Sequence, residues 1–309
     1  MARAVGLLVG MAADQVFGDP KRHHPVAWFG AAAQRLEELT YRDDQTAGAL
    51  HTLALLVPLA GLGCAIERFT DERPIMKCAG TAVTTWAVLG TAQLADEGHK
   101  MAELLASSDV DAARRQLPNL CGRDADQLDA PELARATIES MAENTADAGV
   151  ASIFWGAVAG LPGMLVHRGA NTLDAMIGHH NERYENFGAC AARLDDVLDL
   201  VPARLTALLA AVCSGNVESF RIALRDHAKH PSPNGGWCEA AWAGALGVQL
   251  GGRNIYYGGR VEDRGLLGDG PRPGATEVAS AAKLVTKVAH GAACIAAGGL
   301  LIAALTRQD

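Results

Sequence analysis

Five long stretches with almost no charged residues constrain the fold of this 309-residue chain more than any other feature. They are Ala49–Ile66, Cys78–Ala95, Ala148–Val166, Val201–Gly215 and Val288–Leu305. A membrane-spanning helix needs roughly 20 mainly apolar residues. The last stretch fits this requirement best, and Lys283 and Lys287 precede it as a charged interfacial edge. Val201–Gly215 is short and contains Arg204, so it is either a buried helix or a half-span.

The composition favours helices over sheets. Hydrophobic residues make up 49% of the chain and aromatic residues only 5%. Small apolar residues let helices pack closely, whereas sheets favour aromatic and β-branched residues. We therefore predict an all-α, polytopic helical membrane protein, with residues 1–309 forming a single integral membrane domain. The mean hydropathy of +0.08 is low for such a protein, so an Ala-rich soluble helical bundle is the alternative.

Polar segments separate the apolar stretches and are predicted to form the active-site side. They cover about residues 18–48, 96–147, 167–200 and 216–283. Within them we predict helices over Asp96–Leu105 and Pro131–Asp147, because Pro131 followed by Glu132 is a helix-start signal. Pro231–Pro273 is rich in Gly and Pro and is predicted to be an ordered loop region.

Charge and cysteine patterns exclude several classes of protein. The formal net charge is −8, and the Lys and Arg residues form no basic stripe, so nucleic acid is not an expected partner. The seven Cys residues form no C-x-x-C pair, which indicates reduced, mostly buried thiols. The chain contains no P-loop and no G-x-G-x-x-G motif. Any nucleotide is therefore held by a less common arrangement.

The first polar motif combines Gly18-Asp19-Pro20 with His24-Pro25. Gly-Asp-Pro interrupts a helix and places a carboxylate at the interruption, where it can hold Mg²⁺ or an amine. The alternative is a simple turn with a capping Asp19.

The second polar motif repeats every four residues through Arg135, Glu139, Glu143 and Asp147. Residues with this spacing share one face of a helix. Three carboxylates on one face repel each other unless a cation lies among them, and Mg²⁺ binds one or two carboxylates together with substrate phosphates. A Mg²⁺–nucleotide site is one interpretation, and a solvated face on which Arg135 pairs with Glu139 is the other.

The third motif packs both charge signs, amides and a phenol into a short segment, as expected for binding a large polar anion. Arg can hold phosphate or carboxylate with its planar fork. His179-His180 is not expected to bind a metal, because neighbouring residues rarely share one ion. The candidate residues of this segment are Asn171, Asp174, Asn181, Glu182, Arg183, Tyr184, Arg193, Asp195 and Arg204.

The fourth motif contains Asn234, Trp237 and Glu239 around Gly235-Gly236. A Gly-rich turn that opens a helix can bind an anion.

Taken together, these blocks resemble the CbiB/CobD family of adenosylcobinamide-phosphate synthases from about Asp14 to Pro273. Each block is weak alone, and the ordered set is specific. The blocks are GDP-x-x-x-HPV-x-x-x-G, IES-x-AEN-T-x-D, NTLD-x-M-x-G, NERY-x-x-FG, ARLDD, VPARLT and SPN-x-GW-x-EAA-x-AGALG. The departures are Ala148, Ser152 and His179-His180, and the last of these puts substrate detail in question.

The resemblance implies a role in cobalamin biosynthesis. It implies an ATP-dependent ligase that joins the corrin carboxylate of adenosylcobyric acid to (R)-1-amino-2-propanol or its O-phosphate, with ATP and Mg²⁺ as cofactors and the corrinoid as substrate. The expected place is the inner, cytoplasmic membrane, in contact with lipid and with the active site on the cytoplasmic side. Self-association and contacts with other late enzymes of the pathway are further expectations.

Roles for individual residues follow from this implied reaction. We expect Glu139, Glu143 and Asp147 to be catalytic and to hold Mg²⁺, and Asp174, Asp195 or His24 to accept a proton from the attacking amine. The expected substrate- and phosphate-binding residues are Asp19, His24, Asn144, Asn171, Asn181, Glu182, Arg183, Tyr184, Arg193, Arg204, Asn234, Trp237 and Glu239. The alternatives are a non-catalytic membrane sensor and a transporter of a corrinoid or another anion.

Overall fold

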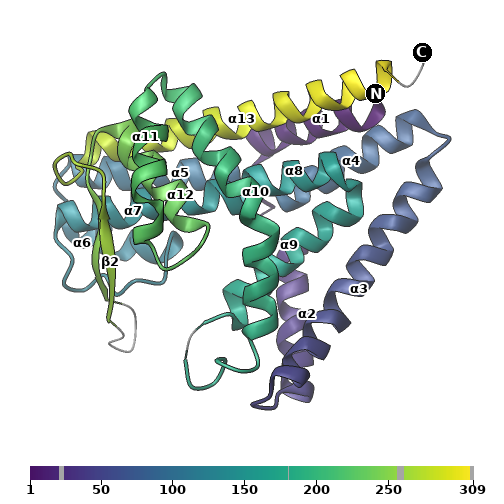
Figure 1. Ribbon diagram of the computed structural model, residues 1–309, viewed down its shortest axis with the longest axis horizontal. Coiled ribbons are helices and arrows are strands. Elements are labelled where there is room, and N and C mark those ends of the chain that lie inside the picture. Colours follow the sequence, from purple (N-terminus) through teal and green to yellow (C-terminus); the bar gives the residue numbers. More distant parts are fainter. Residues whose placement is uncertain (21–23, 180, 256–260, 307–309) are drawn as a thin grey trace. The chain divides into compact units, whose positions relative to one another are not determined.

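The computed structural model describes residues 1–20, 24–179, 181–255 and 261–306, which are mostly helical (Figure 1). Contacts divide the chain into two compact units. Unit 1 comprises residues 1–90, 147–199 and 292–309, and unit 2 comprises residues 91–146 and 200–291. The expectation of one membrane domain over residues 1–309 stays a prediction.

Unit 1 is built from helices that pack closely through small residues. A Cβ atom on Gly6 or Gly10 would lie 2.5 Å from the Cβ atom of Thr81 or Thr85, so these glycines allow α1 to approach α4. The helices α2 and α3 both contact α9. The helices of this unit are α1 (Ala2–Phe17), α2 (Pro25–Thr40), α3 (Gln45–Thr70), α4 (Pro74–Val88), α8 (Ala151–Val158) and α9 (Gly160–Ile177), with the π-helix Ala146–Val150 before α8.

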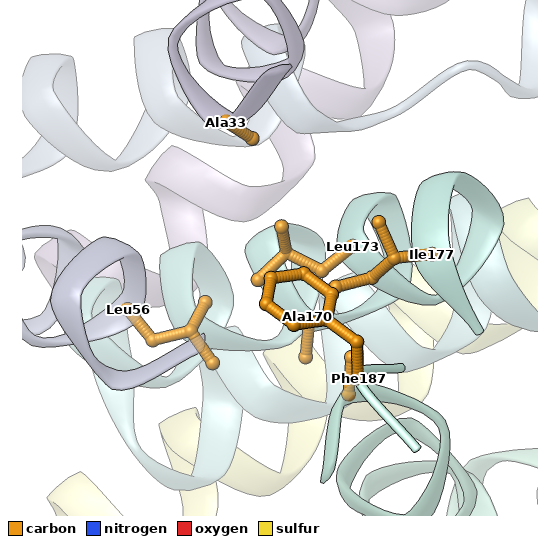
Figure 2. Packing of buried hydrophobic residues seen from close by; sticks show 7 residues of the cluster. Ala33, Leu56, Ala170, Leu173, Ile177 and Phe187 are labelled. Carbon is orange, nitrogen blue, oxygen red and sulfur yellow. The ribbon is translucent and has the colours of Figure 1, made fainter. Parts of the chain in front are cut away.

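The core of unit 1 gathers around Phe187, which is fully buried. Figure 2 shows its ring close to Leu173 and Ile177 of α9, with Leu56 of α3 nearby. The Phe187 ring centroid also lies 5.1 Å from that of His51. This core attaches the segment before α10 to α3 and α9.

Unit 2 combines a helical core with one β-hairpin. The helix α7 packs against α5 and α12, and α12 packs against α11. The strands β1 and β2 are antiparallel, with Leu250 opposite Leu267. The elements of this unit are α5 (Thr91–Ala106), α6 (Val110–Gln116), the 3₁₀-helix Leu117–Asn119, α7 (Ala130–Thr145), α11 (Val217–Asp226), the 3₁₀-helix His227–Lys229, α12 (Gly235–Leu246), β1 (Leu250–Ile255) and β2 (Val261–Leu267). The remaining helices, α10 (Ala189–Ser214) and α13 (Ala275–Leu305), contribute residues to both units.

Among the described residues, three helices are long and apolar enough to cross a membrane, namely α3, α10 and α13. Leu50, Leu53, Val57 and Leu62 are all exposed along α3. A continuous exposed apolar face is unfavourable in water and suits a lipid environment. These three helices and the exposed apolar face of α3 confirm the prediction of a helical membrane protein.

Two of the five predicted spans are wrong as single helices. Cys78–Ala95 is interrupted after Val88, where the Gly90 N–H bonds to the Ala148 carbonyl instead of continuing the helix. Ala148–Val166 is interrupted between α8 and α9, where the Leu161 N–H donates to Glu67 Oε1 at 3.1 Å. Tertiary hydrogen bonds at both interruptions replace helical ones.

The predictions for the polar segments had mixed outcomes. Asp96–Leu105 lies inside α5, and the helix predicted to begin at Pro131 is α7, capped by the Asp129 side chain. Val201–Gly215 is the second half of the longer α10. The prediction of a loop over Pro231–Pro273 is wrong, because this range contains α12 and the hairpin. Its glycines lie at helix ends and in the hairpin, where Gly is also common.

Candidate functional site

Unit 1 brings four carboxylates together from separate elements. Asp147 lies in the π-helix, Asp174 on α9, and Asp195 and Asp199 on α10. The charges of the other three all act on Asp195, and Asn171 donates a hydrogen bond to its carboxylate. Asp195 Oδ1 is buried and makes no hydrogen bond with the described residues. Three predicted site residues, Asp147, Asp174 and Asp195, and Asn171 as well, therefore lie in one cluster, which we call the Asp195 cluster.

Arg168 and His167 are the described basic residues that face the Asp195 cluster. Arg168 interacts with Asp147, Asp19 and Asp195, although burial lowers its pKa below the ordinary value. His167 Nε2 lies 2.9 Å from Asp199 Oδ1. Potential ligand atoms of His167, Asp195 and Asp199 lie within 4.8 Å of one another. Close carboxylates repel one another, and a cation among them would lower that repulsion.

Asp19 and His24 lie near each other before α2. His24 Nδ1 accepts a hydrogen bond from the Val26 N–H at 3.2 Å and so caps α2, and its Nε2 lies 3.9 Å from Asp19 Oδ1. Burial raises the pKa of Asp19, partly opposed by His24. The motif therefore does serve as a turn with a cap, but His24 supplies the cap and Asp19 remains a partly buried carboxylate.

Glu139 lies in unit 2 in a fully buried ion-pair network. It accepts hydrogen bonds from Arg123, from Arg135 Nη1 at 3.1 Å, and from the Gly251 N–H at 2.6 Å. Burial alone would raise the pKa of Glu139, but the two arginines and the Gly251 N–H lower it to about 2. The predicted Arg135–Glu139 pair exists, but the expectation of a solvated helix face is wrong because both side chains are buried.

The expected carboxylate row does not lie within one α-helix. The α-helix ends at Thr145, and Asp147 lies in the π-helix that follows. The four-residue spacing places side chains on one face only while the α-helical geometry persists. Arg135, Glu139 and Glu143 share α7, whereas the continuation of their face to Asp147 and the Mg²⁺ roles of Glu139, Glu143 and Asp147 stay predictions.

Glu143 belongs to a second group of unit 2, which we call the Glu239 cluster, together with His230, Glu239 and Arg264. Glu239 Oε1 accepts a hydrogen bond from Arg264 Nη1 at 2.8 Å and lies 3.3 Å from His230 Nε2. Glu143 Oε1 lies 3.7 Å from both His230 Nε2 and Arg264 Nη1. Burial raises the pKa of Glu239 to about 7, with Glu139 and Glu143 adding to the shift and His230 opposing it.

Other predicted residues of unit 2 support this region. Asn144 Nδ2 donates to the Ser140 carbonyl at 2.9 Å. Arg204 Nη1 donates to Asn234 Oδ1 at 3.3 Å, and the Arg204 guanidinium lies 5.0 Å from the centre of the Trp237 ring. Asn234 precedes the first residue of α12, so the predicted helix start at the Gly-rich turn is confirmed.

The Asn181–Tyr184 block of unit 1 is engaged with α2. Arg183 Nη2 donates to Glu37 Oε1 at 2.8 Å, and Tyr184 Oη donates to the same oxygen at 3.0 Å. The Arg183 guanidinium lies 4.1 Å from the centre of the Tyr41 ring. Asn181 Oδ1 accepts from the backbone N–H groups of Arg183 and Tyr184. These contacts hold the segment in place.

The remaining predicted residues lie on the surface or outside the described residues. Glu182 and Arg193 are exposed. His180 lies outside the described residues, so the expectation for His179-His180 stays a prediction.

Sequence reasoning gave no role to His167 and Arg168, which begin the polar segment that contains Asn171 and Asp174. It missed Asp199 in the Asp195 cluster, His230 and Arg264 in the Glu239 cluster, and Arg123, which pairs with Glu139. Arg264 lies in a strand and reaches Glu239 across 25 residues. No periodic spacing connects such residues. The one local signal was His230-Pro231, directly before the Ser232-Pro233-Asn234 block.

Comparison with known proteins places the chain in a family. The family model described as CobD/Cbib protein matches residues 7–285. A Mycobacterium tuberculosis (strain CDC 1551 / Oshkosh) protein named Cobalamin biosynthesis protein CobD is 48% identical over 302 residues, which cover 95% of each chain. A protein of the same name from Rhodobacter capsulatus is 37% identical over 298 residues, which cover 93% of this chain and 94% of that protein. No solved structure matches. The matched range and these identities show that this chain belongs to the CobD/Cbib protein family.

Proposed function

We propose that this protein is a cobalamin-biosynthesis enzyme that forms an amide bond at the expense of ATP. Its acid substrate is the corrin carboxylate of adenosylcobyric acid, and its amine substrate is (R)-1-amino-2-propanol or its O-phosphate. The names of the relatives support the pathway. The ligase reaction is our inference from the sequence resemblance and from the chemistry of the polar clusters.

The reaction needs an activated carboxylate, because a carboxylate and an ammonium do not condense in water. A carboxylate oxygen attacks the γ-phosphorus of ATP, and ADP leaves. The ammonium loses a proton, its nitrogen attacks the carbonyl carbon, and inorganic phosphate leaves as the amide forms. Catalysis of the first step depends on positioning and on stabilising phosphate charge.

The observation that carries the proposal is the Asp195 cluster of unit 1. Four carboxylates converge there, and Asp195 Oδ1 makes no hydrogen bond with the described residues. Oxygen donors of this kind fit Mg²⁺, which prefers carboxylate oxygens and substrate phosphates. We assign Asp147 and Asp195 as the Mg²⁺ ligands, with Asp174 beside them. When bound, the ion would neutralise phosphate charge.

Glu139 does not join this assignment. Its carboxylate already accepts from Arg123, Arg135 and the Gly251 N–H. A carboxylate held by two guanidinium groups has little negative charge left for a metal ion. Its role in our proposal is to hold α7 against the start of the hairpin.

The three apolar helices support a location in a membrane. We propose the cytoplasmic membrane, with the active site on the cytoplasmic side, where ATP is available. The same location would bring the protein near other late enzymes of the pathway.

The proposal is tested with detergent-purified protein, adenosylcobyric acid, aminopropanol phosphate, ATP and Mg²⁺, followed by mass spectrometry of the corrinoid. The expected result is an ATP-dependent mass gain equal to the amine minus water. A parallel reaction with free aminopropanol identifies the amine form. Folded protein that yields no product with either amine would contradict the ligase and favour a sensor or transporter.

A further inference from the structure

The Glu239 cluster of unit 2 contains a buried acceptor without a partner. Glu239 is 0% exposed, and its Oε2 atom makes no hydrogen bond with the described residues, whereas its Oε1 accepts from Arg264. Buried polar atoms in proteins nearly always have partners, and an exception calls for a ligand or another explanation. Oε2 is therefore a candidate contact for a ligand that donates a hydrogen bond.

The charges around Glu239 favour a cationic ligand. Glu143 and Glu239 both lie near Arg264, and Glu262 Oε1 accepts from Arg264 Nε at 2.7 Å. Potential ligand atoms of Glu143, His230 and Glu239 lie within 4.8 Å of one another, and the nearby charges of Glu139 and Glu143 oppose ionisation of Glu239. A small cation would lower the repulsion between Glu143 and Glu239.

The tautomer of His230 argues against a metal ion here. His230 Nδ1 accepts a hydrogen bond from the Ser232 N–H at 3.0 Å, so the ring proton lies on Nε2, which faces the carboxylates. A metal-binding histidine has the opposite arrangement, with a free lone pair toward the metal and an N–H donated elsewhere. The cation is therefore expected to be an organic one that donates hydrogen bonds to carboxylate oxygens.

The approach to the cluster suits a small ligand. The Glu143 side chain is 33% exposed, so solvent reaches the side of the cluster that Glu143 forms. A Cβ atom on Gly235 would lie 2.7 Å from Glu143 Oε1 and 3.0 Å from His230 Cε1. The absence of a side chain at position 235 therefore leaves the room that Glu143 occupies beside His230.

We propose that Glu143 and Glu239 bind the primary ammonium group of the amino-alcohol substrate, with His230 and Arg264 positioning Glu239. This inference rests on the proposed ligase function, because that reaction supplies a small primary amine. It assigns the amine to the Glu239 cluster of unit 2. Glu239 and Glu143 thereby determine that an amine is accepted rather than a diol.

Amine binding is measured directly by titration calorimetry on detergent-purified protein, without ATP or corrinoid. The probes are 1-amino-2-propanol and its O-phosphate, with 1,2-propanediol as an uncharged control. The expected result is that at least one amine binds and the diol does not. Glu239→Gln and Glu143→Gln should each weaken amine binding at least tenfold, whereas Glu218→Gln, which changes an exposed carboxylate of the same unit, should leave it unchanged.

Gly235→Ala provides a second variant if Glu239→Gln does not fold. An added methyl group would displace the Glu143 carboxylate while suiting the helix, so amine affinity should fall in a folded protein. Wild-type amine affinity in both Glu143→Gln and Gly235→Ala would overturn the proposal. So would binding of Zn²⁺ or Mn²⁺ that is lost in the same variants, because it would identify a metal site.

The outcome is separable from that of the proposed function. Amine binding that depends on Glu143 and Glu239, without any amide product, would contradict the ligase and leave the ammonium site standing. Amide product formed with an unchanged KM for the amine in Glu143→Gln would support the ligase and overturn the ammonium site.

Discussion

His230 Nε2 lies 3.3 Å from Glu239 Oε1, and both side chains are buried. The imidazole and the carboxylate come from opposite sides of the Gly-rich turn that opens α12. His230 Nε2 and the second oxygen of Glu239 are both buried and make no hydrogen bond with the described residues. This pair makes the stability of the protein depend on pH.

Stability should fall as pH rises through the pKa of Glu239. Burial, with Glu139 and Glu143, raises the pKa of this carboxyl from 4.5 to about 7, so the folded protein favours the protonated form. The stabilisation is fully present below pH 4.5 and is lost as pH rises through about 7. The melting temperature in detergent, measured from pH 5 to 8, should fall more for wild type than for Glu239→Gln. The raised pKa of His230 acts in the same direction. Parallel curves for the two proteins would contradict the assignment.

Glu139→Gln should strongly destabilise unit 2. It removes the charge that Arg123 and Arg135 share in a buried network, and breaking a buried ion pair costs about 3–5 kcal/mol. Thermal unfolding in detergent should show a large decrease in melting temperature. Arg221→Gln, which breaks an exposed ion pair with Glu218, is the control and should stay close to wild type. A Glu139→Gln protein as stable as this control would contradict a structural role for Glu139.

Asp195→Asn should lower the rate of the ligase reaction, because it removes a proposed ligand of the Mg²⁺ ion that would neutralise the charge of the ATP phosphates. Loss of a group that stabilises charge at the reacting centre typically lowers the rate about 100-fold. The apparent requirement for Mg²⁺ should also increase, which a titration of activity against Mg²⁺ concentration measures. Asp111→Asn, at an exposed carboxylate of α6, serves as control. An unchanged Mg²⁺ dependence in an active Asp195→Asn protein would contradict the Mg²⁺ assignment.

Arg183→Ala should affect stability more than nucleotide binding. The guanidinium donates to Glu37 and lies over the Tyr41 ring, so its removal loosens the Asn181–Tyr184 segment from α2. We expect a small decrease in melting temperature, smaller than for Glu139→Gln because Arg183 is half-exposed, and an unchanged KM for ATP. An increase in that KM with unchanged stability would restore Arg183 as a phosphate-binding residue.

The helical character of the chain and many of its chemistry-bearing residues could be predicted from local patterns. The predicted carboxylates Asp147, Asp174 and Asp195 do lie in one cluster, although no spacing links them. The change from the α-helix to a π-helix after Thr145 could not be predicted from the four-residue spacing of Glu139, Glu143 and Asp147. Two apolar stretches also failed as spans, because hydrogen bonds from other elements replace helical ones at their interruptions.

The amino-acid sequence by itself determined the helix-forming composition, two of the three described helices that are long and apolar enough to cross a membrane, and the ordered polar blocks that place the chain in its family. These depend on interactions between residues close in the chain, whose periodicity can be read directly. Only the tertiary structure decided which charges meet. Arg123 and Gly251 pair with Glu139, and His230 and Arg264 lie beside Glu239. Partners far apart in sequence are selected by packing and by the cost of burying an uncompensated charge, and neither leaves a spacing in the sequence.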